Sequence, residues 1–229
     1  EETYIDFYIK RLQAMLKDKQ VSSAVPQIWS VVILFLRCPL DRWQYYGPWL
    51  TLVQTAFNMP DVITKQEANN AWNRYVYLSL VDSKLPTKSI SILCQPLLSQ
   101  LKRKASAKQQ ELRRIVMGGV CSLYYFAFAQ SDDKYPTDVV WDAAVQPVVA
   151  QLTSLDGNPD APADSLLQAA RILVGLLDVS TPRPPRNLER IMDPTPLKPE
   201  DLLPLDSKWV RRNCDKVLQA AGPILEKKF

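Results

Sequence analysis

Histidine is absent from this chain of 229 residues, and glycine occurs only six times. Without imidazole, the chain lacks the commonest general base and the commonest metal ligand. No apolar run reaches the roughly 18 residues that a membrane-spanning helix needs. Eighteen prolines beside so few glycines favour short elements with stiff connections over a glycine-hinged catalytic scaffold. With 47% hydrophobic and 23% charged residues, the chain is expected to be a folded globular protein that needs no cofactor.

Cysteine is sparse as well. Cys38, Cys94, Cys121 and Cys214 lie far apart and never form a Cys-x-x-Cys pair. A zinc site needs clustered thiolates, and a secreted disulfide framework needs a denser pattern. The spacing therefore predicts reduced thiols in an apolar core, inside the cell.

Apolar residues recur at three- and four-residue spacing along nearly the whole chain, which indicates helices. The pattern predicts helices over residues 4–16, 28–36, 48–57, 64–81, 137–154, 164–178 and 207–225, and a helix pair between Pro86 and Gln130. Thr64 to Glu67 and Ser106 to Gln109 have the spacing of capping boxes. Turn dipeptides of the hairpin kind are missing, so no strand is predicted.

An internal repeat indicates how these helices are organised. Residues 95–101, with Pro96, recur as residues 146–152, with Pro147, and Pro48-Trp49-Leu50 is a fainter copy. A helix pair repeated at this period cannot bury its apolar face alone, so neighbouring pairs must stack. The sequence therefore predicts an all-α fold, an α-solenoid of HEAT or armadillo-like helix pairs.

The expected domain organisation is three-part. Stacked repeats cover residues 1–180, a proline-rich connector covers 181–206, and residues 207–229 add a further helix of the same solenoid. The connector is expected to cross the surface in an extended form, although a polyproline ligand for a partner protein is a second interpretation. Because the chain opens within a predicted helix, we expect it to be part of a longer protein.

Positive charge is concentrated in two clusters. The first cluster, between Leu101 and Val116, contains six cationic residues and one acidic residue, Glu111. The second cluster lies after Asp206. The candidate nucleic-acid-binding residues are Lys102, Arg103, Lys104, Lys108, Arg113 and Arg114 in the first cluster, and Lys208, Arg211, Arg212 and Lys216 in the second. Such side chains can neutralise phosphates without reading bases. Cations near helix ends also complement the helix dipole, so a purely structural role is the alternative.

No catalytic site is evident. The pair Asp138 and Asp142 has no neighbour that would raise one pKa, the potential nucleophiles lack a base, and no metal site is expected. The aromatic residues fall at helical spacing, which favours core packing over base stacking. Gly118-Gly119 within a helix is expected to permit close helix packing. We therefore do not expect an enzyme.

Residues 64–74, TKQEANNAWNR, resemble the lysine-then-Ala-Trp helix of the N-terminal helical-repeat domain of the Rap-interacting factor family. Residues 88–97, KSISILCQPL, resemble that family's following Leu-Leu-x-Gln-Pro-Leu helix, and residues 111–128 occupy the slot of its aromatic-rich helix. The resemblance covers about residues 25–150, and the proline-rich spacing resembles fungal members.

The resemblance implies a hook-shaped solenoid that binds DNA and serves as a scaffold in chromatin. It also implies a nuclear protein of chromosomes and telomeres that acts in telomere-length control, replication timing and DNA repair. Family members recruit type-one protein phosphatase through R-V-x-F and S-I-L-K motifs. This chain has no R-V-x-F, and Ser91-Ile92-Leu93-Cys94 lacks the lysine, so phosphatase docking is expected in other parts of the parent protein.

Two classes of function remain open at this stage. One is a non-catalytic module that contacts DNA phosphates without sequence readout, beside chromatin or telomere proteins and away from membranes. The other is a protein-binding scaffold whose Arg and Lys residues meet phosphorylated or acidic partner segments.

Overall fold

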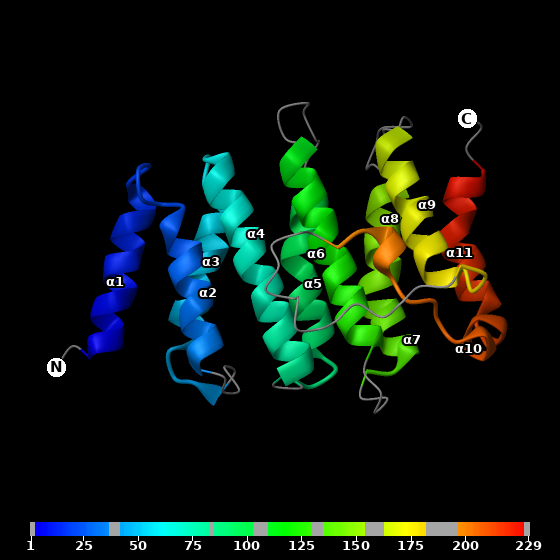
Figure 1. The fold of residues 1–229 in the computed structure, drawn as a ribbon, viewed down its shortest axis with the longest axis horizontal. Coiled ribbons are helices and arrows are strands. Elements are labelled where there is room, and N and C mark those ends of the chain that lie inside the picture. Colours follow the sequence, from blue (N-terminus) through cyan, green and yellow to red (C-terminus); the bar gives the residue numbers. More distant parts are fainter. Residues whose placement is uncertain are drawn as a thin grey trace.

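The fold is a row of helices. The computed structural model describes residues 3–36, 42–82, 85–102, 110–129, 135–153, 163–181 and 197–226, and within these ranges no residue forms a β-strand. The helices stand side by side in sequence order, and the two termini lie at opposite ends of the row (Figure 1). The predicted all-α solenoid is thereby confirmed.

Antiparallel helix pairs make up the row. The successive pairs are α1 (Tyr4–Lys17) with α2 (Ala24–Leu36), α3 (Tyr46–Asn58) with α4 (Val62–Tyr77), and α5 (Ser89–Leu101) with α6 (Gln110–Phe128). In the fourth pair the first helix is composite, and its parts are α7 (Thr137–Val140), a π-helical turn (Trp141–Val145) and α8 (Gln146–Thr153), followed by α9 (Ala163–Leu177). The row ends with α10 (Ser207–Arg212) and α11 (Cys214–Leu225).

One hydrogen bond recurs at each of the first three junctions between pairs. An aromatic side chain on the second helix donates to a backbone carbonyl on the first helix of the next pair, 20 or 21 residues further along the chain. The bonds are Trp29 Nε1 to Trp49 O at 2.7 Å, Trp72 Nε1 to Leu93 O at 2.9 Å, and Tyr124 Oη to Ala144 O at 3.0 Å. All three donors are at most 1% exposed, which for these residues confirms the expectation that aromatic residues at helical spacing pack in the core.

Two of these acceptors lie three residues before a proline. Leu93 precedes Pro96, and Ala144 precedes Pro147. A proline inside a helix removes the donor to the carbonyl four residues earlier and crowds that turn. The aromatic donors bind the carbonyl next to this one, in the same disturbed turn, and a π-helical turn lies directly before the Gln146-Pro147 segment. The repeated Gln-Pro segment of the sequence thus lies in the helix whose carbonyl accepts the junction hydrogen bond.

Close approach of α4 and α6 depends on Gly119. A Cβ atom at this position would lie 2.8 Å from Asn73 Oδ1 of α4 and 3.0 Å from Leu97 Cδ2 of α5. Both separations are shorter than normal van der Waals contact, so with a larger residue the Asn73 and Leu97 side chains or the helices would have to shift. The predicted packing role of the glycine pair is confirmed at Gly119.

The junction to the fourth pair differs from the others. Helices α2 and α4 pack along each other, as do α4 and α6, but residues 197–205 lie between α6 and α9 and contact both. We call these residues the strap; it includes a 3-10 turn over Pro199–Asp201 and crosses the face of the stack (orange in Figure 1). Leu202 and Leu205 of the strap are buried at 0% and 5% exposure. The predicted connector is therefore a packed element in its last part, while its residues 182–196 lie outside the described ranges.

Two predicted helix limits need correction. Helix α4 begins at Val62, because the Asp61 side chain accepts the backbone N–H of Thr64 at 2.8 Å and caps the helix. Thr64 itself is buried, so the predicted capping box there is wrong; the box from Ser106 to Gln109 lies outside the described residues. The predicted helix over 207–225 is interrupted at Asn213, which separates α10 from α11.

The cysteine prediction is confirmed for two thiols. Cys94 and Cys121 are fully buried, and desolvation raises the pKa of Cys94 to about 12 and that of Cys121 further still. Both thiols are therefore protonated and unreactive at neutral pH. Cys214 is exposed, so its predicted place in the core is wrong, and Cys38 lies outside the described residues.

We expect Tyr124→Phe to lower the free energy of unfolding by about 1–3 kcal/mol, because the Ala144 carbonyl loses a buried donor. Tyr8→Phe is the matched control: Tyr8 is 55% exposed, and its loss of a hydroxyl should change stability by no more than about 0.5 kcal/mol. Urea denaturation followed by circular dichroism measures both variants. Equal midpoints would show that the junction bond contributes nothing to stability.

Candidate nucleic-acid interface

The first basic cluster lies where α5 ends and α6 begins. Lys102 follows the last residue of α5 and is exposed, as is Arg114 on the first turns of α6. Arg103, Lys104 and Lys108 lie outside the described residues. Two solvent-facing cations of the predicted site are thus placed at one edge of the stack.

Arg114 is paired with Glu111 one turn earlier. Its Nε and Nη2 atoms donate to the two carboxylate oxygens at 2.9 Å and 2.6 Å. These hydrogen bonds lower the pKa of Glu111 and raise that of Arg114. Both side chains remain more than half exposed, so water screens the pair and an incoming phosphate could compete for the guanidinium.

Arg113 points inward, unlike its neighbour. Its Nη1 donates to the Leu101 carbonyl at the end of α5 at 3.0 Å, and its Nη2 donates to Ser165 Oγ of α9 at 3.3 Å. Burial lowers the pKa of this guanidinium. A cation at a helix carboxyl end satisfies an orphan carbonyl and complements the helix dipole. Arg113, a candidate nucleic-acid-binding residue from the sequence, therefore joins two helix pairs and is not presented to solvent as Arg114 is.

The second basic cluster lies on α10. Lys208, Arg211 and Arg212 are exposed, and within the described ranges no carboxylate lies at ion-pair distance from them. Asp206 caps this short helix through the backbone N–H of Lys208 at 3.1 Å. These three cations are presented to solvent by a fixed helix.

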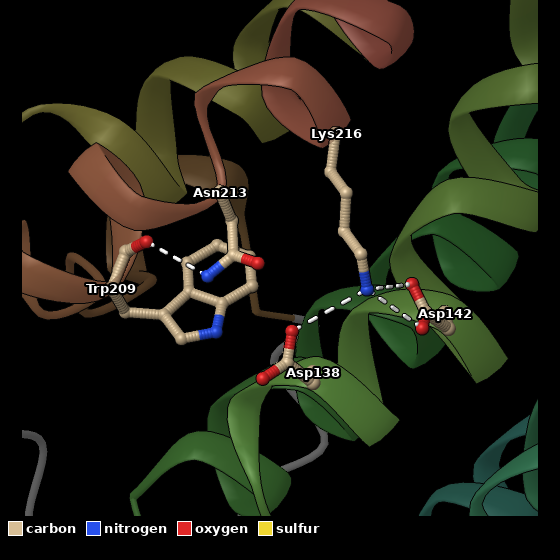
Figure 2. A network of polar contacts seen from close by, with 5 residues as sticks. All are labelled: Asp138, Asp142, Trp209, Asn213 and Lys216. Atoms are coloured by element: carbon tan, nitrogen blue, oxygen red, sulfur yellow. Dashed lines mark hydrogen bonds and ion pairs between the residues drawn. The ribbon is translucent and has the colours of Figure 1, made fainter.

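Lys216, the fourth predicted cation of this cluster, is held by two carboxylates. Its Nζ lies 2.8 Å from Asp142 and 3.4 Å from Asp138, so α11 is tied to the first helix of the fourth pair (Figure 2). The hydrogen bond to Asp142, reinforced by Asp138, raises the pKa of Lys216. Part of the acidic charge seen in the sequence is thus neutralised within the chain.

The surroundings of this clamp are aromatic. Trp209 packs on Trp141 with ring centroids 5.3 Å apart, and Asn213 Nδ2 donates to the Trp209 carbonyl at 3.0 Å (Figure 2). Lys216 consequently serves to dock the last two helices, and it is not available to phosphates in the way that Arg211 and Arg212 are.

The two clusters do not share one face. The end of α5 and the start of α6 lie at one edge of the stack, and α10 lies at the opposite edge (Figure 1). The two clusters are therefore presented at separate edges.

Over the described ranges, no group of histidine, cysteine or carboxylate side chains could hold a metal ion. None of the helices in those ranges is long and apolar enough to cross a membrane.

Comparison with known proteins gives two matches. The family model described as Rap1-interacting factor 1 N terminal matches residues 1–145. A relative from Schizosaccharomyces pombe, the telomere length regulator protein rif1, is 21% identical over 204 residues. That match covers 88% of this chain but only 14% of the relative. No solved structure matches.

The structure predicts opposite results for two adjacent arginines. Arg113→Gln removes the donor to the Leu101 carbonyl and should lower the free energy of unfolding by about 1–2 kcal/mol. Arg114→Gln, the matched control, removes the same charge from a solvated pair and should leave the midpoint unchanged. Chemical denaturation measures the unfolding midpoints of the two variants. Equal midpoints would show that Arg113 does not join the helix pairs.

Proposed function

Because this chain belongs to the Rap1-interacting factor 1 N-terminal family, whose model covers more than half of its residues, we propose that it contacts nucleic-acid phosphates as a non-catalytic scaffold module of a telomere or chromatin regulator. The name of the fission-yeast relative supports the telomeric part of this proposal. We place the protein in the nucleus, on chromosomes and at telomeres, where chromatin or telomere proteins would be its partners. Recruitment of type-one phosphatase would fall to other parts of the parent protein.

The observation that carries the DNA proposal is the α10 cluster. Lys208, Arg211 and Arg212 project from one short helix without a carboxylate partner among the described residues. Exposed cations held close together attract a polyanion and release its counterions on binding. Lys102 and Arg114 at the other edge add a second, weaker point of contact, because Arg114 must first leave Glu111.

The arrangement favours binding without sequence readout. The described cations of both clusters lie at helix ends or on the short helix α10, and no described segment beside them could enter a groove and read base edges. Since the clusters lie at opposite edges, a duplex along one edge meets one cluster only, and the two contributions should be independent (Figure 1). We expect the chain alone to bind duplex DNA with a dissociation constant of about 10⁻⁴ to 10⁻⁶ M at physiological salt.

Charge-removal variants test the proposal. In the α10 variant, Lys208, Arg211 and Arg212 are replaced by Gln. In the edge variant the same change is made at Lys102, Arg103, Lys104, Lys108 and Arg114. Arg113 is left intact in both because of its structural role. Each phosphate contact that is lost should reduce the slope of log K against log salt by about 0.9 for duplexes of any sequence.

The control variant removes three exposed cations far from both clusters, Arg11, Lys17 and Lys19, and so has the same net charge as the α10 variant. Its binding should stay near that of the unmodified chain. If affinity at two salt concentrations is unchanged in the α10 and edge variants, the DNA role is rejected. Loss of binding to a phosphoserine peptide in those same variants would then favour the protein-scaffold alternative.

A further inference from the structure

The junction between the third and fourth pairs is held together on one side and separated on the other. On the side of the first helices, α5 packs directly on α8 and on the π-helical turn before it. On the side of the second helices, Arg113 of α6 donates to Ser165 of α9 at one end, and the 3-10 turn of the strap contacts both helices. At the earlier junctions α2 packs along α4, and α4 along α6. The strap therefore takes much of the place that a helix-to-helix contact occupies at the earlier junctions.

Gly175 of α9 allows the strap to approach the helix backbone closely. A Cβ atom at Gly175 would lie 2.3 Å from the Pro199 carbonyl oxygen and 3.2 Å from Leu202 Cδ1. At the preceding junction Gly119 plays the matching part, because its missing side chain makes room for Asn73 of α4. A glycine thus permits the close approach of a helix at one junction and of the strap at the next.

The strap is fixed along its length. Leu202 is fully buried, and the backbone N–H of Leu205 donates to the Leu176 carbonyl of α9 at 2.8 Å. Arg171 of α9 pairs with Glu200 at 2.6 Å at the exposed side of the strap. The 3-10 turn of the strap also contacts α6, so the strap touches both second helices of this junction.

We propose that the strap is a wedge that sets the bend of the solenoid between α1–α6 and α7–α11. Two stacked pairs that touch on one side and are spaced apart on the other must turn toward the side in contact. With the strap released, α6 and α9 can approach each other more closely away from their Arg113–Ser165 contact, and the bend changes. The strap, and not helix packing alone, then sets the shape of this module.

Gly175→Ala tests the wedge, because the added methyl group meets the backbone of the strap and the strap must move. We expect the Leu205 amide to exchange with solvent at least tenfold faster in this variant. Gly222→Ala is the matched control: Gly222 also lies in a helix, and its added Cβ would meet nothing within 4 Å. Leu202→Ala removes apolar contacts made by the strap itself. It is the second test variant if Gly175→Ala does not fold.

The bend is read from the distance between spin labels on α2 and α9. Exposed Gln27 and Leu167 are changed to Cys in a chain whose Cys38 and Cys214 are Ser; Cys94 and Cys121 are buried and stay unlabelled. We expect the label distances to shorten in Gly175→Ala or Leu202→Ala and not in Gly222→Ala. Faster exchange with unchanged distances would overturn the proposal, since the strap would then be only a cover. Unchanged exchange in both variants would overturn it as well, since the strap would not depend on the Gly175 seat.

Discussion

The hydrogen bond from a buried aromatic side chain to a carbonyl of the next helix pair is the interaction on which the stack depends. Each pair of a solenoid contacts only its neighbours, and apolar burial between them is not directional. A hydrogen bond stabilises the polar atom of a buried Trp or Tyr, so it favours the registers that bring a carbonyl within reach. Trp29, Trp72 and Tyr124 therefore fix how each pair meets the next, 20 or 21 residues along the chain.

The register of the repeats could be predicted from the sequence, but the bonds that enforce it could not. Pro96 and Pro147 lie in similar segments, so the repeat can be recognised from the sequence. Each proline disturbs its helix in the same way. The donors differ in kind, Trp or Tyr, and the acceptors are backbone atoms that no residue type marks. Trp72 could be placed in the core from its helical spacing, whereas its bond to the Leu93 carbonyl needed the packing of α4 on α5.

Charge composition predicted where cations gather but not which of them meet solvent. Arg113 and Arg114 are adjacent in the sequence, yet about 100° of helix rotation turns one toward α5 and α9 and leaves the other exposed. Lys216 lies more than seventy residues from Asp138 and Asp142, so its clamp follows from the folding of α11 onto the fourth pair. The cations of α10, like Lys102 and Arg114, are exposed, and among the described residues those of α10 have no carboxylate at ion-pair distance.

The strap links the shape of the module to the position of its charge. It separates α6 from α9, and its last residue, Leu205, bonds to Leu176 directly before Asp206 caps α10. The same few residues that set the spacing of the second helices therefore also set where Lys208, Arg211 and Arg212 project. A proline-rich segment with no helical pattern, which reads as a simple connector in the sequence, thus determines both the bend of the stack and the placement of its most accessible basic surface.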